Sequence, residues 1–321
     1  MLFYMSRTHT QKLTTKLMAG GFAISLMIMC ALPSYSSEIE PIFDLNHVRE
    51  AIHYFEDPTN KNISHVAFTT AAAKLRHYFN SQIKNGGSYG QESTYETTTT
   101  LLTQTVSSGM LSRIKALITL MAGSDDKQQQ CVTKAQSFLP QGVLINQPLY
   151  IVWGDGKYRT MSIDGIAILD ITSQDYRDRS HDIWVECVLS IHKAQMQILH
   201  PIPFSLSQIT HSDEMLAYVE QLVLINGASY YAAYSTHPSV INEVETQEKY
   251  NQLRASLAGT PRILNNDDWQ LINTLLDGTQ TARNMGIVMA RKIDSTLGRT
   301  ALTHAYKGGA ASFFRAFNEL N

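Results

Sequence analysis

The sequence predicts a mainly helical α+β fold, a helical bundle-like body around a small central β-sheet. Apolar residues recur at helical spacing over residues 38–140 and again over 172–321. Between them, residues 141–171 are rich in β-branched and aromatic side chains, which is typical of strands. No linker of distinct composition separates the three parts. We therefore expect one domain over residues 38–321 with one continuous core.

The composition excludes two classes of protein. Of the 321 residues, 44% are hydrophobic, which is too many for a disordered chain. The 26 basic and 28 acidic side chains give a formal charge of −2, so the chain lacks the basic excess of a nucleic-acid binder. We therefore expect no nucleic acid among its partners.

Residues 1–37 have the layout of a secretory signal peptide. Three basic side chains and no acidic ones precede Glu38, and residues 17–32 are uncharged. These 16 residues fall short of the ~20 that a membrane-spanning helix needs, although an uncleaved anchor is the alternative. We expect export to the periplasm or the medium. The mature chain would have no membrane span and a formal charge of −5.

Hydrophobic periodicity places helices in the N-terminal part and strands in the middle. The expected helices cover residues 45–55, 65–83, 95–122 (with Ser-Ser-Gly at 107–109 able to break it) and 125–138. The expected strands lie within residues 142–153, 158–161 and 166–171. Gly154-Asp155-Gly156 is interpreted as a hairpin turn. The apolar run 166–169 should be buried.

The C-terminal part shows a series of amphipathic helices. They are expected at residues 184–198, 215–234, 239–257, 266–276 and 285–297, followed by a last helix with Phe313, Phe314 and Phe317. Two cysteines remain in the mature chain, Cys131 and Cys187. An exported protein can keep them as a disulfide, and a pair of buried free thiols is the alternative.

No intact catalytic motif occurs in the chain. The sequence lacks His-Glu-x-x-His, Gly-x-Ser-x-Gly, a phosphate-binding loop and a dinucleotide fingerprint. We therefore assign no catalytic residue and expect no cofactor.

Four C-terminal segments carry a resemblance to a known family. They read NGASYYA at 226–232, GTQTARNMGIVMARKI at 278–293, LGRTAL at 297–302 and FFRAF at 313–317. Together they resemble bacterial zinc-dependent metallopeptidases of the gluzincin type. The resemblance covers roughly residues 140–321. It implies a metallopeptidase-like fold, with a His-Glu-x-x-His helix after the sheet and a glutamate-glycine pair on the next helix.

The zinc-binding positions implied by this resemblance are not kept. Val188 and Leu189 stand where the first histidine and the general base would be, and only the second histidine is present, as His192. Asn226 replaces the third ligand. Zinc hydrolysis needs three protein ligands and a carboxylate that takes a proton from water, so it should be absent here.

The leading hypothesis is thus an exported protein of metallopeptidase-like fold that binds a peptide or protein in the former cleft. The candidate binding residues are His192, Asn226, Tyr230 and Tyr231, within a group of tyrosines that includes Tyr218 and Tyr234. No metal site is assigned.

Two alternatives stay open. One is an active hydrolase with a rearranged metal site that uses His192, His211 or Glu214, since the last two lie three residues apart on one helical face. A helix cap at Thr210 or Ser212, with acids in the first turn, explains the same residues without a metal. The other alternative is a helical secreted interaction protein unrelated to peptidases.

Overall fold

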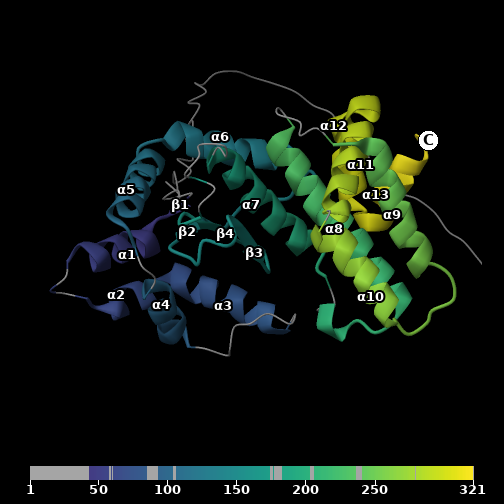
Figure 1. The fold of residues 1–321 in the computed structure, drawn as a ribbon. Coiled ribbons are helices and arrows are strands. Elements are labelled where there is room, and N and C mark those ends of the chain that lie inside the picture. The colour runs from purple at the N-terminus through teal and green to yellow at the C-terminus, as the bar shows by residue number, and fades with distance from the viewer. Residues whose placement is uncertain are drawn as a thin grey trace, which may run out of the picture. The chain divides into compact units, whose positions relative to one another are not determined.

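The structure has the predicted class: a small sheet lies among many helices (Figure 1). The computed structural model describes residues 43–57, 59, 61–84, 93–103, 106–173, 176, 183–202, 206–235, 241–278 and 280–320. These residues all belong to one unit, Glu40–Asn321. The predicted signal peptide, residues 1–37, lies outside the described residues.

The helices largely follow the predicted order. They are α1 (Asn46–Glu56), α2 (Ile63–Ala67), α3 (Thr70–Lys84), α4 (Thr94–Leu102), α5 (Ser108–Ala122), α6 (Asp125–Gln136), α7 (Ile183–Leu199), α8 (Ser212–Tyr234), α9 (Glu243–Leu257), α10 (Asn266–Asn273), α11 (Thr281–Leu297), α12 (Arg299–Lys307) and α13 (Gly309–Asn318). Short helical turns occur at Leu206–Gln208 (η2) and, as a π-helix after α10, at Thr274–Gly278 (η3). None of the described helices is both long and apolar enough to cross a bilayer.

Two expected helices are divided in the structure. The helix predicted at 65–83 is interrupted between α2 and α3. The helix predicted at 95–122 breaks before α5, as its Ser-Ser-Gly sequence allowed. There Ser107 is the N-cap, and its side chain accepts a hydrogen bond of 3.1 Å from the Met110 N–H.

The sheet contains four strands in the order β1-β2-β4-β3. These are β1 (Phe43–Asp44), β2 (Leu149–Val152), β3 (Thr160–Ile163) and β4 (Ile166–Asp170). β1, β2 and β4 are parallel to one another, and β3 is antiparallel to β4. The sequence did not predict β1, because two residues are too short to show an alternating pattern.

The hairpin turn lies at Asp164–Gly165, not at Gly154–Gly156 as predicted. Both central residues have positive φ angles, 48° and 79°, as a tight β3–β4 hairpin requires. Because β3 pairs with β4 and not with β2, the segment after β2 cannot form a hairpin turn. Instead, the N–H groups of Gly154 and Gly156 donate hydrogen bonds to the buried carboxylate of Asp170, at 3.0 and 2.8 Å.

Both faces of the sheet are covered by helices (Figure 1). Leu149, Ile151 and Leu169 pack into a core shared with α1, α5, α6 and α7. Tyr150, Val152 and Ile168 face the opposite way, into a smaller cluster with α3 and α4. Because both faces are buried, the strands have continuous apolar sequences. Three residues of the predicted buried run, 167–169, are indeed buried.

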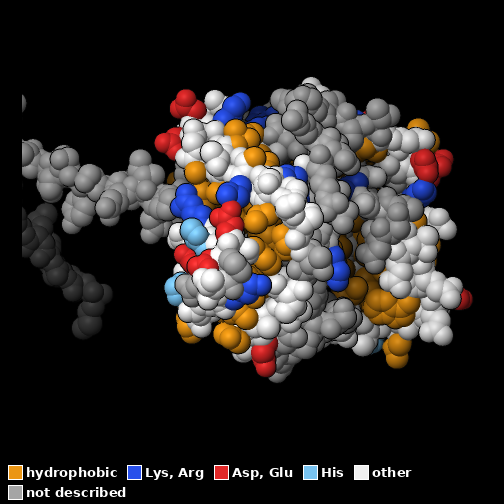
Figure 2. Space-filling view, turned by 60° about the vertical axis from the view of Figure 1, so that its left-hand side comes forward, with side chains coloured by type: hydrophobic (Ala, Val, Ile, Leu, Met, Phe, Trp, Pro, Cys, Tyr) orange, Lys and Arg blue, Asp and Glu red, His pale blue; other side chains and the backbone are white. Residues whose placement is uncertain are grey.

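A disulfide between Cys131 and Cys187 fastens α6 to α7, which settles the two alternatives left by the sequence. The Cα atoms of the two cysteines are 6.2 Å apart, and both residues are buried in the core next to the sheet. The C-terminal helices form a second core. On the face drawn in Figure 2, basic and acidic side chains are intermingled.

Helices α8 and α11 meet at two glycines. A Cβ atom added to Gly227 would lie 2.5 Å from the carbonyl carbon of Gly286 and 3.0 Å from the Ile287 nitrogen. A Cβ atom added to Gly286 would lie 2.6 Å from the Gly227 Cα. The two backbones therefore touch directly, and this contact fixes the position of the α8 face described next.

Candidate functional site

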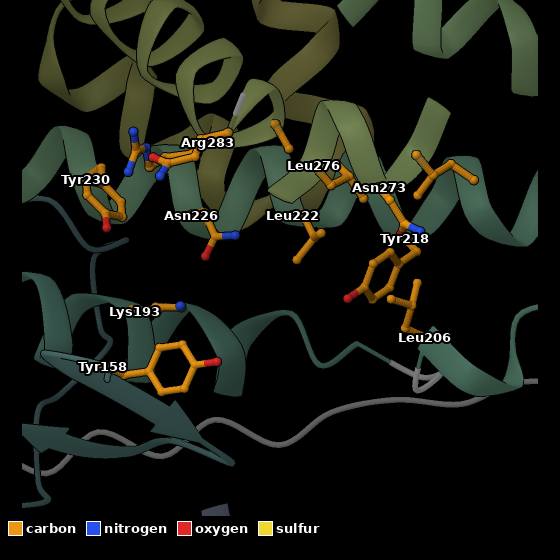
Figure 3. Close-up of a pocket in the computed structure, with 13 residues that line it drawn as sticks. Tyr158, Lys193, Leu206, Tyr218, Leu222, Asn226, Tyr230, Asn273, Leu276 and Arg283 are labelled. Carbon is orange, nitrogen blue, oxygen red and sulfur yellow. The ribbon is translucent and has the colours of Figure 1, made fainter. Parts of the chain in front are cut away.

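A cavity of about 440 Å³ lies between α7, α8, α11 and the α10–η3 segment. Its volume is within the range of small-molecule sites, roughly 300–1,000 Å³. Figure 3 shows side chains of α7, α8, α11, the α10–η3 segment and η2 converging on it, together with Tyr158 from the loop before β3.

One face of α8 forms a long wall of the cavity. Tyr218, Leu222, Asn226 and Tyr230 are spaced four residues apart, which places them on one side of a helix. Figure 3 shows this row along α8, with the Asn226 amide directed toward the side where Lys193 of α7 lies. Asn226 and Tyr230, two of the four predicted binding residues, thus share this cavity.

Two basic side chains reach the same end of the cavity. Lys193 is half-buried, and burial lowers the pKa of its ammonium group. The Arg283 guanidinium carbon lies 4.5 Å from the centre of the Tyr230 ring, and its Nε donates a hydrogen bond to Asn284 Oδ1 at 3.3 Å. Among the described residues, no acidic side chain lines the cavity and neither cation has an ionic partner.

The opposite end of the cavity is apolar. Leu206, Leu222 and Leu276 lie away from the two cations, next to Tyr218 and Asn273 (Figure 3). The cavity therefore offers a basic, hydrogen-bonding end and an apolar end. This combination suits a ligand with one anionic group and one apolar group.

His192 does not reach the cavity, although it was a predicted binding residue. It is fully buried, with Nδ1 3.1 Å from Ser229 Oγ and Nε2 3.3 Å from the Phe138 carbonyl oxygen. Because a carbonyl only accepts, Nε2 donates a hydrogen bond to Phe138, while the Ser229 hydroxyl beside Nδ1 also donates to the Ile225 carbonyl oxygen at 2.7 Å. Burial lowers the pKa of His192 to about 4, so it is neutral at pH 7. Its role is to join α7, α8 and the chain after α6.

The residues at the implied zinc positions do not fit a zinc ion. Val188 and Leu189 are buried and have no donor atom, and both nitrogens of His192 are engaged. Asn226 lines the cavity and His192 does not, so these two positions do not face one cavity. In the described part of the chain, no three His, Cys, Asp or Glu side chains are placed to hold a metal ion.

Tyr231, the remaining predicted binding residue, also lies outside the cavity lining. Its hydroxyl donates a 2.8 Å hydrogen bond to Asp294 Oδ2, and Arg299 contacts the same carboxylate at 2.6 Å. Tyr234 is likewise occupied, because its hydroxyl donates to Glu186 Oε1 at 2.8 Å. Of the tyrosine group, only Tyr218 and Tyr230 line the cavity.

The weak metal candidates His211 and Glu214 form a helix cap. Glu214 Oε2 accepts hydrogen bonds from the N–H groups of Thr210 and His211, at 3.1 and 3.2 Å. His211 is the N-cap of α8, so the expected caps Thr210 and Ser212 are each one residue away from it. The arrangement explains why an acid stands in the first turn.

Sequence reasoning missed the two cations, Lys193 and Arg283. The sequence did contain an indication of Lys193: within the largely apolar helix α7, Glu186 and Lys193 are the only Asp, Glu, Lys or Arg residues. Asn226 likewise stands between two tyrosines on one helical face. An isolated polar group on such a face indicates either a buried partner or a cavity.

Comparisons of the chain with protein-family models, with curated proteins and with solved structures find no match. The resemblance to metallopeptidases therefore rests on the sequence segments named above. What the protein does is argued from the cavity.

Proposed function

We propose that this is an exported protein that binds the end of a peptide chain in the cavity between α7, α8, α10–η3 and α11, without hydrolysing it. The observation that carries the proposal is the lining: two cations without an ionic partner in the described residues, together with tyrosines, amides and an apolar end. Such a lining is suited to holding a ligand, and the lining residues that the structure describes include no carboxylate to activate water.

The size and the amides of the cavity favour a chain end as its ligand. About 440 Å³ holds a few small groups, so a folded partner could insert only a terminus or a side chain. Asn226 and Asn273 line the wall, and each side-chain amide both donates and accepts. A peptide group has the same complementary pair of donor and acceptor.

The residues at the implied zinc positions on α7 argue against zinc hydrolysis. The α7 positions that would hold the metal and the base are the apolar Val188 and Leu189, packed in the core beside the sheet. His192 is tied to Ser229 and Phe138. A zinc ion bound by His192 would require two new protein ligands and a new base, and it would break these hydrogen bonds.

Two features support export. The N-terminal 37 residues have the layout of a signal peptide. The disulfide between Cys131 and Cys187 is the kind of bond that persists in oxidising compartments and is rare in the cytosol.

A retention assay tests the proposal. The chain from residue 38 onwards is incubated with a pool of random hexapeptides, and bound peptides are identified by mass spectrometry after gel filtration. Asn226→Trp fills the cavity with an indole and should abolish retention. Ala217→Trp, on an exposed position of the same helix, is the matched control and should retain the peptides.

The same samples decide between binding and cleavage. With zinc added, we expect every peptide to be recovered intact. Cleavage that a chelator abolishes, or retention by Asn226→Trp equal to that of the unaltered chain, would contradict the proposed function.

A further inference from the structure

We infer that the basic end of the cavity holds the terminal carboxylate of the bound peptide, between Lys193 and Arg283. This inference rests on the proposed function and narrows it to peptides with a free C-terminus. It also predicts an apolar terminal side chain, which would lie toward Leu222 and Leu276.

Lys193 and Arg283 differ from several basic side chains of the C-terminal part that are paired with acids. Those pairs are Arg254 with Glu220 at 3.9 Å, Arg262 with Asp268 at 2.6 Å, Arg291 with Glu243 at 3.4 Å and Arg299 with Asp294 at 2.6 Å. Lys193 and Arg283 both line the one cavity and lack such a partner in the described part of the chain. A ligand carboxylate would supply the missing negative charge.

Because Lys193 and Arg283 are partly buried, the lack of a neighbouring anion is unfavourable in free energy. A cation removed from water loses solvation energy, which an anion in contact with it restores. For Lys193, this loss of solvation lowers the pKa of the ammonium group below its ordinary value. Hydrogen bonds between a charged donor and a carboxylate are about twice as strong as neutral ones.

The first turn of α11 adds to the positive potential at this end. Gln280, the N-cap, and Ala282 both line the cavity, and the Gln280 side chain makes no capping hydrogen bond. The first N–H groups of a helix lack acceptors within it, and the helix dipole favours negative charge there. Asn226 faces the same end from α8 and can donate from its amide nitrogen (Figure 3).

The two ends of the cavity determine the direction in which the bound peptide runs. With the carboxylate at Lys193 and Arg283, the rest of the peptide must extend away from the cations. The nearest apolar surface is formed by Leu222 and Leu276. A leucine-sized terminal side chain therefore buries its surface there, whereas a charged one would lose solvation.

The experiment compares two probes that differ in one group. N-acetyl-alanyl-leucine has a free carboxylate, and N-acetyl-alanyl-leucinamide has a neutral amide in its place. Binding to the chain from residue 38 is measured by chemical-shift titration at low salt. We expect the amide to bind at least about tenfold more weakly, as the loss of a charged hydrogen bond implies.

Variants locate the carboxylate. Lys193→Gln and Arg283→Gln should each weaken binding of the free acid about tenfold and leave binding of the amide unchanged. Lys307→Gln and Arg315→Gln, at exposed positions outside the cavity lining, are the matched controls and should change neither. Circular dichroism confirms that each variant is folded.

The outcomes separate this inference from the proposed function. Equal binding of acid and amide, or competition by inorganic phosphate at the same concentration as the acid, would overturn the carboxylate assignment. If neither dipeptide binds while the hexapeptide pool is retained, the inference is wrong and the proposed function stands. If the pool is not retained either, the proposed function is wrong.

Discussion

Replacing Gly227 by alanine tests the backbone contact that positions the α8 wall of the cavity. The new Cβ would lie 2.5 Å from the carbonyl carbon of Gly286, whereas carbon atoms pack at about 3.5–4.0 Å. The neighbouring atoms belong to the α11 backbone, so no side chain can rotate away. Because the new Cβ would lie closer still to the Gly286 Cα, helices α8 and α11 must separate by more than about 1 Å at their closest point.

The expected loss of stability is the difference of two terms. Overpacking of a filled core costs about 3 kcal/mol at the upper end of its usual range, which is appropriate where backbone must move. Alanine has a higher helix propensity than glycine, which returns about 1 kcal/mol. The free energy of unfolding should therefore fall by about 2 kcal/mol.

Urea unfolding followed by circular dichroism measures this loss. Gly109→Ala is the matched control, because a Cβ at Gly109 of α5 has no atom within 4 Å. The control should leave the unfolding midpoint unchanged or raise it. If Gly227→Ala is as stable as Gly109→Ala, the two helices do not touch as described and the argument fails.

Three further predictions concern the rest of the chain. Changing Cys131 and Cys187 together to alanine should lower the free energy of unfolding by about 4 kcal/mol, since the bridge closes a loop with a sequence separation of 56; urea unfolding that gives no change would show that no bridge forms. Burial holds the pKa of His192 at about 4, below its ordinary 6.5, so the unfolded chain takes up the proton first as the pH falls. Between pH 8 and pH 5 the unaltered chain should therefore lose about 2 kcal/mol of unfolding free energy more than His192→Gln does, and parallel losses would contradict this burial. Mass spectrometry of the exported protein should give the mass of a chain that begins near Glu38. A mass that includes residues 1–37 would instead indicate that this segment is retained as an uncleaved membrane anchor.

Much of the fold could be predicted because its elements are long and periodic. Helix α7 has an apolar face that repeats over four turns, and α11 has an equally clear one. The strand pairing was harder, since it depends on which turn closes a hairpin. Asp164-Gly165 carries the stronger hairpin signal, but the two glycines around Asp155 drew the prediction to the wrong loop.

The site was predictable only in part. The row of tyrosines and Asn226 on α8 could be read from spacing, because residues four apart share a helical face. Tyr231 and His192 do not line the cavity, because Tyr231 bonds to Asp294 and His192 to Phe138. Both partners are far away in the sequence, so the spacing of residues on one helix could not reveal them. No pattern within one helix could reveal that Lys193 and Arg283 meet at one end of a cavity.

The bridge between Cys131 and Cys187 has a consequence for resistance to proteases, which the proposed export would expose the chain to. The segment it encloses contains β2, β3 and β4, and so most of the sheet. A single cut anywhere within that segment leaves the two fragments covalently joined. The nicked protein would run as one species until a reductant is added, and the cavity helices after α7 would stay attached to the N-terminal half.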